Sequence, residues 1–280
     1  MRRLLIRPGA IGDCIVSFPA LESCIECYTE VWIPSTVAPL VRFGNAVRPI
    51  ASTGLDLVGV GDLEMPSALY EKLRSFDSII SWYGTNRREF REALLRLGID
   101  CAFHTALPSA DYTGHAIDFF ARQVGAPCGL IPRISIEQPS MKRDAIVIHP
   151  FSGSARKNWP LPLFRKLAER LACPVEWTAG PEEALDNAVR FENLSDLAAW
   201  LAGARLFIGN DSGIAHLAAA VGVPTLALFG PTSPDIWAPR GEQVIALRAD
   251  PIQELEIEVV TAAANRLLGV SSARPASEQP

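Results

Sequence analysis

Short runs of apolar residues alternate along the chain with longer stretches in which apolar positions recur every three or four residues. A short apolar run is typical of a strand buried on both faces, and the longer period is typical of a helix. In the first half this pattern predicts strands at Leu4–Arg7, Glu30–Ile33, Leu57–Val60 and Ser78–Trp82. It predicts helices over Ile11–Glu26 with a break near Pro19, and over Ser67–Phe76, Arg87–Leu97 and Asp111–Gly125.

The same alternation begins again after the polar, proline-bearing passage Pro127–Met141. We expect strands at Ala145–His149, Val175–Thr178, Leu206–Ile208 and Thr225–Phe229, and helices over Leu163–Ala172, Glu182–Val189, Ser195–Ala202 and 252–268. Repeated strand–helix units with strands apolar on both faces predict parallel sheets covered by helices. The pattern therefore predicts an α/β protein with domains at 1–140 and 141–270 and a loose tail at 271–280. The last helix could pack back on the first domain.

Composition and net charge exclude some classes of protein. The chain has 280 residues, of which 49% are hydrophobic and 20% charged, and its net charge is −5. This charge argues against a general nucleic-acid-binding protein. The sequence contains no run of 18 apolar residues, and its first residues are too short an apolar run for a signal peptide. We expect a cytoplasmic protein.

Cysteine spacing gives little support to a metal site. Cys24 and Cys27 form a C-x-x-C pair, but no second pair or histidine pair follows at zinc-site spacing. We expect no metal and interpret the six cysteines as buried free thiols in a reducing compartment.

Two polar turns follow strands in the segment 208–233. Asn210, Asp211, Ser212 and Gly213 come after the first strand, and Gly230–Ser233 after the second. Either Asp211 or Ser212 can cap the next helix, which leaves backbone N–H groups and the positive end of the helix dipole facing a ligand. His216 lies about one turn into that helix. Since ligands of open α/β sheets bind at the carboxyl ends of strands, we expect a phosphorylated or nucleotide-bearing ligand here.

A serine-, glycine- and cation-rich loop follows the strand that ends at His149. Ser152, Gly153 and Ser154 offer hydroxyl and N–H groups to phosphate oxygens, and Arg156 and Lys157 offer positive charge. The loop lacks the Walker A spacing, and an ordinary solvated loop is the alternative.

Three further features allow both a functional and a structural interpretation. Glu182 follows a strand and can bind ribose hydroxyls or simply open a helix. Gly9 and Gly12 permit a tight turn before Asp13, which can serve as a general base or as a first-turn carboxylate favoured by the helix dipole. The basic helix with Arg87, Arg88, Arg91 and Arg96 can meet an acidic acceptor at a membrane surface or form a solvated face balanced by Glu89 and Glu92.

Taken together and in this order, the motifs resemble glycosyltransferase family 9, the ADP-heptose:lipopolysaccharide heptosyltransferases and their relatives. The motifs that carry the resemblance are Arg7–Asp13 with Phe18–Leu21, His149–Ser154 with Lys157–Pro160, Ala179–Glu182, Leu194–Ala204, Asp211–His216 and Leu228–Thr232. They cover the second half almost continuously and about the first twenty residues. The resemblance implies the GT-B arrangement, in which two Rossmann-like domains face each other across a cleft.

The resemblance also implies roles for individual residues. Asp13 would deprotonate the acceptor hydroxyl, and Lys157 would hold the donor diphosphate with Ser152, Gly153 and Ser154 beside it. Glu182 would bind ribose and Asp211 the transferred sugar, with the phosphates near Ser212, Gly213 and His216. Acceptor contacts would fall to Gly9, Gly12, Arg87, Arg88 and Arg91. Lysine and the helix-end N–H groups would replace a metal.

We therefore expect an inverting, metal-independent transferase that needs no cofactor. Its donor would be a nucleotide-diphospho-sugar, ADP-heptose in the first place, and its acceptor a lipopolysaccharide-core or related glycan or glycolipid. We expect a monomer that binds no nucleic acid and can contact the inner face of the bacterial inner membrane. Two departures concern the acceptor and the donor turn: the first half is shorter than in typical members, and Ser212 stands where threonine is more usual. A nucleotide-sugar epimerase and a non-catalytic nucleotide-sugar-binding protein stay open as alternatives.

Overall fold

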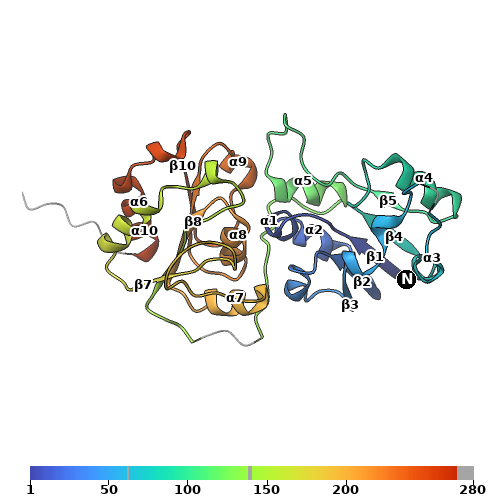
Figure 1. Cartoon of the computed structure of the whole chain (residues 1–280), viewed down its shortest axis with the longest axis horizontal. Helices are drawn as coiled ribbons and strands as arrows, with labels where there is room; N and C mark the ends of the chain where they lie inside the picture. The colour runs from blue at the N-terminus through green and yellow to red at the C-terminus, as the bar shows by residue number, and fades with distance from the viewer. Residues whose placement is uncertain (62, 138–140, 270–280) are drawn as a thin grey trace, which may run out of the picture. The chain divides into compact units, whose positions relative to one another are not determined.

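The computed structural model describes residues 1–61, 63–137 and 141–269, which form two compact units (Figure 1). The first unit comprises Met1–Ser135 with Asn193–Ser195, and the second comprises Ile136–Glu192 and the chain from Asp196 onward. The predicted tail 271–280 lies outside the described residues. Within the described ranges, no helix is both long and apolar enough to cross a membrane.

The first unit is built on a parallel five-stranded sheet in the order β3-β2-β1-β4-β5. The strands are β1 (Arg2–Ile6), β2 (Tyr28–Ile33), β3 (Ala46–Pro49), β4 (Ser78–Ser81) and β5 (Ala102–Phe103). The helices are α1 (Ile11–Ile15), α2 (Phe18–Ser23), α3 (Ser67–Arg74), α4 (Arg88–Arg96) and α5 (Ala116–Gln123), with 3₁₀ turns η1 (Ala38–Leu40), η2 (Ile50–Ser52) and η3 (Leu55–Leu57).

Alternation along the central strand β1 explains why both faces of this sheet are covered. Leu4 and Ile6 belong to a buried cluster with side chains of α3 and α4, such as Leu73 and Phe90. Leu5 is equally buried and points to the opposite face, because successive strand side chains alternate. The predicted break near Pro19 is confirmed: α1 ends at Ile15, and Pro19 occupies the first turn of α2, where its missing N–H costs nothing.

The second unit has a parallel sheet in the order β10-β9-β8-β6-β7. Its strands are β6 (Ile146–His149), β7 (Val175–Trp177), β8 (Leu206–Asn210), β9 (Thr225–Phe229) and β10 (Val244–Arg248). Its helices are α6 (Leu161–Arg170), α7 (Leu194–Leu201), α8 (Gly213–Ala220), α9 (Pro234–Trp237) and α10 (Ile257–Leu268), with 3₁₀ turns η4 (Ala155–Lys157) and η5 (Ile252–Glu254).

The C-terminal helix α10 packs into the core of the second unit. Its buried residues Val260, Ala264 and Leu268 join a cluster with Phe164 of α6 and the apolar side chains of β6, β8 and β9. Within its own unit, the buried face of this helix is therefore occupied by the sheet, and its packing on the first domain stays a prediction.

Two other local predictions were wrong, and one strand was not predicted. The residues 182–189 form turns instead of a helix, and Arg190 holds them by donating to the carbonyl oxygens of Gly180, Glu183 and Leu185. The segment Leu57–Val60 is not a strand, because the 3₁₀ turn η3 and a further turn occupy it. The third strand of the first sheet is β3, which pairs with β2 and is only partly buried, so its apolar signal is weak.

Candidate functional site

Three loops of the second unit leave neighbouring strands at the same sheet edge. The loop after β6 contains Ser152 and Lys157, the turn after β8 contains Asp211 and Ser212, and the loop after β9 contains Thr232. Because β6, β8 and β9 are adjacent and parallel, their carboxyl ends lie side by side. The structure thus brings the predicted polar turns of this half together.

A lysine–aspartate pair links all three loops. The Nζ of Lys157 donates to Oδ2 of Asp211 at 2.7 Å, and the hydroxyl of Thr232 donates to the same oxygen at 2.6 Å. The Asp211 side chain is 8% exposed and that of Lys157 is 30% exposed. An ammonium group carries three N–H donors, and Asp211 accepts from it at a single oxygen, so Lys157 keeps donors for an anion. The sequence predicts Thr232 in a loop beside the ligand, and the structure adds it to the site through its hydrogen bond to Asp211.

Asn210 fixes the loop after β6 against β8. Its side chain is fully buried, accepts from the N–H of Trp159 at 2.9 Å and donates to the carbonyl oxygen of Pro150 at 2.7 Å. Ser152 is tied into the same loop, since its hydroxyl lies 2.7 Å from Oδ1 of Asn158 and 2.9 Å from the carbonyl oxygen of Ser154. Gly153 is exposed beside them. The sequence predicts Asn210 only as part of the polar turn, and its burial identifies its structural role.

The cap of α8 is Ser212. Its hydroxyl accepts from the N–H of Ala215 at 3.4 Å and its backbone is extended, while Asp211 is engaged by Lys157. This resolves the two capping alternatives in favour of Ser212. The N–H groups of Ala215 and His216 bond back to the carbonyl oxygen of Ser212, so the N–H groups left for a ligand at the start of α8 are those of Gly213 and Ile214. His216, one turn further, is only 6% exposed.

The turn after β7 places its two glutamates differently. Glu182 is exposed, whereas Oε2 of Glu183 accepts from the N–H of Gly180 at 2.6 Å and lies 3.2 Å from Nε2 of His149. Burial alone would raise the pKa of Glu183, but the hydrogen bonds from His149 and Gly180 outweigh it and hold that pKa below its usual value. Glu183 therefore shapes the turn, and Glu182 stays available to a ligand.

In the first unit, Asp13 lies in the first turn of α1. Its Oδ2 accepts from the N–H of Ala10 at 3.2 Å, while its Oδ1 has no hydrogen-bond partner in the described part of the chain. Gly9 has a φ of +130°, and a Cβ there would lie 3.0 Å from Cβ of Asp13, so glycine is required for this turn. Gly12 lies within α1, next to Asp13. The arrangement combines a first-turn carboxylate with one free oxygen.

Arg7 stabilises the turn that carries Asp13 by hydrogen bonds to its backbone. The sequence predicts no role in the site for this residue. Its guanidinium donates to the carbonyl oxygens of Asp13 at 2.6 Å and Pro8 at 2.7 Å, and to the hydroxyl of Ser17 at 2.9 Å. It is 1% exposed and stacks 4.5 Å from the ring centroid of Phe120. Burial lowers the pKa of Arg7, and the nearby Cys14 and Asp13 partly oppose that shift. The buried cation within an apolar run was the signal available in the sequence.

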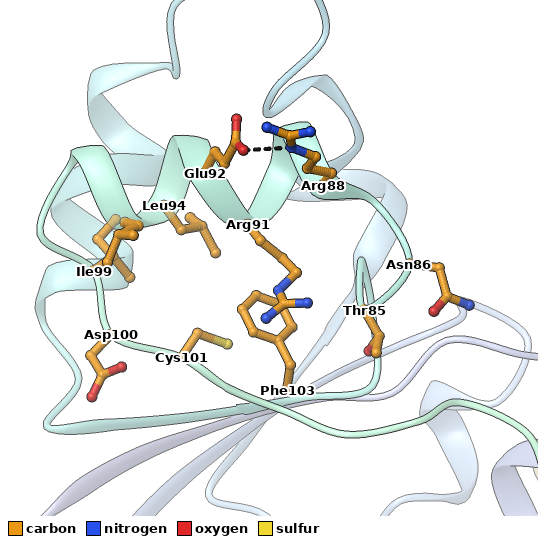
Figure 2. A pocket seen from close by; sticks show the side chains of 11 residues that line it. Thr85, Asn86, Arg88, Arg91, Glu92, Leu94, Ile99, Asp100, Cys101 and Phe103 are labelled. Carbon is orange, nitrogen blue, oxygen red and sulfur yellow. Dashed lines mark hydrogen bonds and ion pairs between the residues drawn. The ribbon is translucent and has the colours of Figure 1, made fainter.

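The three arginines predicted to meet the acceptor, Arg87 before α4 and Arg88 and Arg91 within it, have different surroundings. Arg87 is used internally, donating to the hydroxyl of Tyr83 at 3.0 Å and the carbonyl oxygen of Val58 at 3.1 Å. Arg88 pairs with Glu92 at 2.7 Å on the helix surface. Arg91 points from α4 toward Phe103 in a pocket (Figure 2). Arg88 and Arg91 both line this pocket, but of the two only Arg91 has no ion pair with a residue that the structure describes.

The cysteines are free, but they are not uniformly buried. Cys14 and Cys24 are buried, whereas Cys27 and Cys128 are exposed, which corrects the expectation of six buried thiols. Burial raises the pKa of Cys14 to about 12, so this thiol is neutral. The described residues contain no group of three or more histidine, cysteine, aspartate or glutamate side chains placed to hold a metal.

The comparisons with known proteins agree with this architecture. The sequence profile of glycosyltransferase family 9 (heptosyltransferase) matches residues 118–263, slightly more than half of the chain. Lipopolysaccharide heptosyltransferase 1 of Pseudomonas aeruginosa is 38% identical over 109 residues, which are 34% of this chain and 31% of that protein. The chain thus aligns with about a third of the length of this curated relative.

Solved structures match over nearly the whole chain. A glycosyl transferase family 9 structure from Veillonella parvula has a TM-score of 0.74 at 18% identity and covers 96% of this chain and 97% of its own. The E. coli heptosyltransferase WaaC, solved with ADP, has a TM-score of 0.68 at 18% identity and covers 95% and 100%. These likenesses establish the GT-B heptosyltransferase fold, with its two parallel α/β sheets. On its sequence profile, the chain belongs to glycosyltransferase family 9.

Proposed function

We propose that this protein is an inverting glycosyltransferase that moves a heptose from ADP-heptose to a lipopolysaccharide-core or related glycan acceptor. The observation that carries the proposal is the linked cluster of Lys157, Asp211 and Thr232 beside the Ser212-capped start of α8. It gathers a cation, hydroxyls and unpaired N–H groups at one sheet edge, which suits a diphosphate. Family membership favours a transferase over the epimerase and the non-catalytic binding protein.

The donor half of the reaction is assigned to the second unit. Lys157 and the N–H groups at the start of α8 stabilise the charge that develops on the departing nucleoside diphosphate, with Ser152, Gly153 and Ser154 lining the loop. Glu182 is assigned to the ribose hydroxyls. Asp211 is assigned to the transferred sugar and also holds Lys157 in position before the donor binds. His216, in the first turns of α8, is assigned to the neighbourhood of the donor phosphates.

The acceptor half is assigned to Asp13. In the proposed step its free oxygen takes the proton of the acceptor hydroxyl while the hydroxyl oxygen attacks the anomeric carbon. The bond from that carbon to the diphosphate breaks, and the nucleoside diphosphate leaves with the electron pair, which inverts the anomeric configuration. Gly9 and Gly12 allow the acceptor to approach the backbone. The positive charge is supplied by the protein, so the proposal includes no metal and no cofactor.

We place the enzyme in the cytoplasm as a monomer that acts at the inner face of the bacterial inner membrane. The deciding experiment incubates the purified chain with ADP-heptose and a lipopolysaccharide-core acceptor and follows ADP release and the mass of the glycan. UDP-glucose and GDP-mannose serve as competing donors. We expect ADP release only when both substrates are present. Conversion of the donor without acceptor would indicate an epimerase, and binding without turnover a non-catalytic protein.

A further inference from the structure

A pocket of about 500 Å³ opens between α4 and the edge strand β5 of the first unit (Figure 2). This volume lies within the range usual for small-molecule sites. We call it the β5 pocket. It is lined by residues of the turn after β4, of α4 and of the approach to β5, including Thr85, Asn86, Arg91, Leu94, Cys101 and Phe103.

The cations that line the β5 pocket are not equivalent. Arg88 is neutralised by Glu92, with Nε 2.7 Å from Oε1. The Arg91 side chain makes no hydrogen bond or ion pair with any residue that the structure describes. Its guanidinium carbon lies 5.2 Å from the ring centroid of Phe103. A guanidinium held by an aromatic ring keeps its N–H edge free, and this edge matches a carboxylate or phosphate in a two-point contact.

The rest of the lining suits a hydroxylated ligand. Asp100 lies at the far end of the β5 pocket and can accept hydrogen bonds from hydroxyl groups, and Asn86 can both donate and accept. Leu94 and Ile99 provide apolar walls for a sugar ring. Burial raises the pKa of Cys101 to about 12, so this thiol is uncharged and does not repel an anion. The combination favours an anionic sugar over a purely apolar or purely cationic ligand.

Strand register places one end of the β5 pocket, at Phe103 and the turn after β4, at the sheet edge of the first unit that carries Asp13, while Asp100 lies toward the opposite edge. Ile6 at the end of β1 is paired with Ser81, and Ser81 is paired with Phe103 at the end of β5. Two strand spacings of about 4.8 Å separate Ile6 from Phe103, roughly 10 Å in all. The chain leaves β1 directly into the turn that carries Asp13. A glycan with its reacting hydroxyl at Asp13 can therefore extend toward Phe103 along one sheet edge.

We infer that the β5 pocket is an acceptor subsite for an anionic sugar residue removed from the reacting hydroxyl, with Arg91 as the anion-binding and specificity-determining residue. The identification of this ligand as the acceptor rests on the proposed transferase function. The binding of an anion at Arg91 does not depend on it. The anion is a carboxylate or a phosphate monoester carried by a sugar.

The test measures the binding of an anion directly at the Arg91 side chain by NMR. The full chain is labelled with ¹⁵N-arginine, and the side-chain Nε–H signals of Arg91 and Arg96 are assigned as those missing from Arg91→Gln and Arg96→Gln. Arg96 is the matched control, because it lies on the same helix but lines a different cavity, with Leu63 and Leu97. Glucuronate and glucose 6-phosphate are the two anionic probes, and glucose is the neutral one.

We expect the Arg91 signal to shift in a saturable way with one or both anionic probes and not with glucose, while the Arg96 signal stays in place. The probe that shifts it identifies the anion. Phe103→Leu removes the ring that holds the guanidinium and should weaken probe binding about threefold. Equal shifts at Arg91 and Arg96, equal shifts with glucose, or no shift at all would overturn the subsite.

A kinetic assay then distinguishes a failure of the proposed subsite from a failure of the proposed function. In the transfer assay, Arg91→Gln should raise the acceptor KM about tenfold or more and leave the donor KM unchanged, because a charged hydrogen bond to the acceptor is lost. Arg96→Gln should change neither constant. If the wild-type chain shows no transfer while Arg91 still binds the anion, the proposed function fails and the anion site stands. If transfer occurs and Arg91→Gln leaves the acceptor KM unchanged, the subsite is wrong.

Discussion

Each unit buries a carboxylate beside a lysine, and the two pairs occupy different places in similar sheets. In the first unit Lys72 donates to Glu30 at 2.6 Å, and in the second Lys157 donates to Asp211 at 2.7 Å. Glu30 lies in the middle of β2 and also accepts from Trp32 at 2.9 Å and Arg48 at 2.8 Å. Asp211 follows the end of β8 and precedes the start of α8.

Position in the sheet gives the same chemistry two different roles. Glu30 is 1% exposed and surrounded by donors, so its charge is satisfied within the unit. The Asp211–Lys157 pair meets a capped helix start where N–H groups have no partner within the helix. We therefore interpret the first pair as structural and the second as part of a ligand site. The chemistry of the first unit must then depend on other residues, and Asp13 is the candidate.

The largest effect is expected for Asp13. Asp13→Asn keeps an oxygen for the N–H of Ala10 but cannot take a proton, so transfer should fall by about 10²–10⁴-fold. ADP binding, measured by calorimetry, should stay as in the wild type. Glu89→Gln is the control, since Glu89 is also a first-turn carboxylate of the first unit. Loss of ADP binding or of folding in Asp13→Asn would give Asp13 a structural role and remove the contrast with Glu30.

A smaller effect is expected for Lys157. Lys157→Gln can still donate to Asp211 but carries no charge, and we expect the Kd for ADP to rise by about 10–100-fold as a charged hydrogen bond to phosphate is lost. Arg156→Ala removes an exposed cation from the same loop and should have little effect. The free energy of unfolding should change little in either variant. Unaltered ADP binding in Lys157→Gln would make its pair with Asp211 structural, like that of Glu30.

The contrast also explains what could be predicted from the sequence. The buried strands of both sheets were predicted because apolar runs record burial directly, and the turns after β8 and β9 were predicted because glycine, serine and proline mark strand ends. The helix over 182–189 failed because Arg190 satisfies the backbone carbonyls of a turn, a contact that periodicity does not encode. The Glu30 cluster and the support of Arg7 depend on contacts between residues far apart in sequence.

The third prediction concerns stability and tests whether the Glu30–Lys72 pair is structural, in contrast to the Asp211–Lys157 pair. Glu30→Gln removes the charge that Lys72 and Arg48 face, and we expect a loss of about 2 kcal/mol in the free energy of unfolding, less than for a fully buried pair because both cations reach water. Urea denaturation measures it. ADP binding by the folded variant should be unchanged. A variant with wild-type stability would show that the Glu30 cluster is not the structural counterpart of the Asp211 pair.

The pKa of Glu30 determines how the stability lost in Glu30→Gln should change with pH. Burial alone would raise the pKa of Glu30, but hydrogen bonds from Lys72 and Trp32 and the charges of Lys72 and Arg48 hold it below its ordinary value of 4.5. A carboxyl whose pKa is lowered on folding stabilises the folded state above its unfolded pKa and loses that contribution as the pH falls through its folded pKa. The stability difference between wild type and Glu30→Gln should therefore be constant from pH 7 to about 4.5 and shrink below.

The smallest expected effect, no change at all, is for metal removal. In the proposed mechanism Lys157 and the start of α8 supply the positive charge that a metal provides in other transferases, so EDTA should leave the rate of transfer unaltered. Added Mg²⁺ should not rescue Lys157→Gln. A rate that falls with EDTA and returns with a divalent cation would mean that the Lys157–Asp211 pair does not neutralise the leaving group by itself. Asp211 would then have to be considered as a metal ligand, and the pair would differ from Glu30–Lys72 in its chemistry as well as its position.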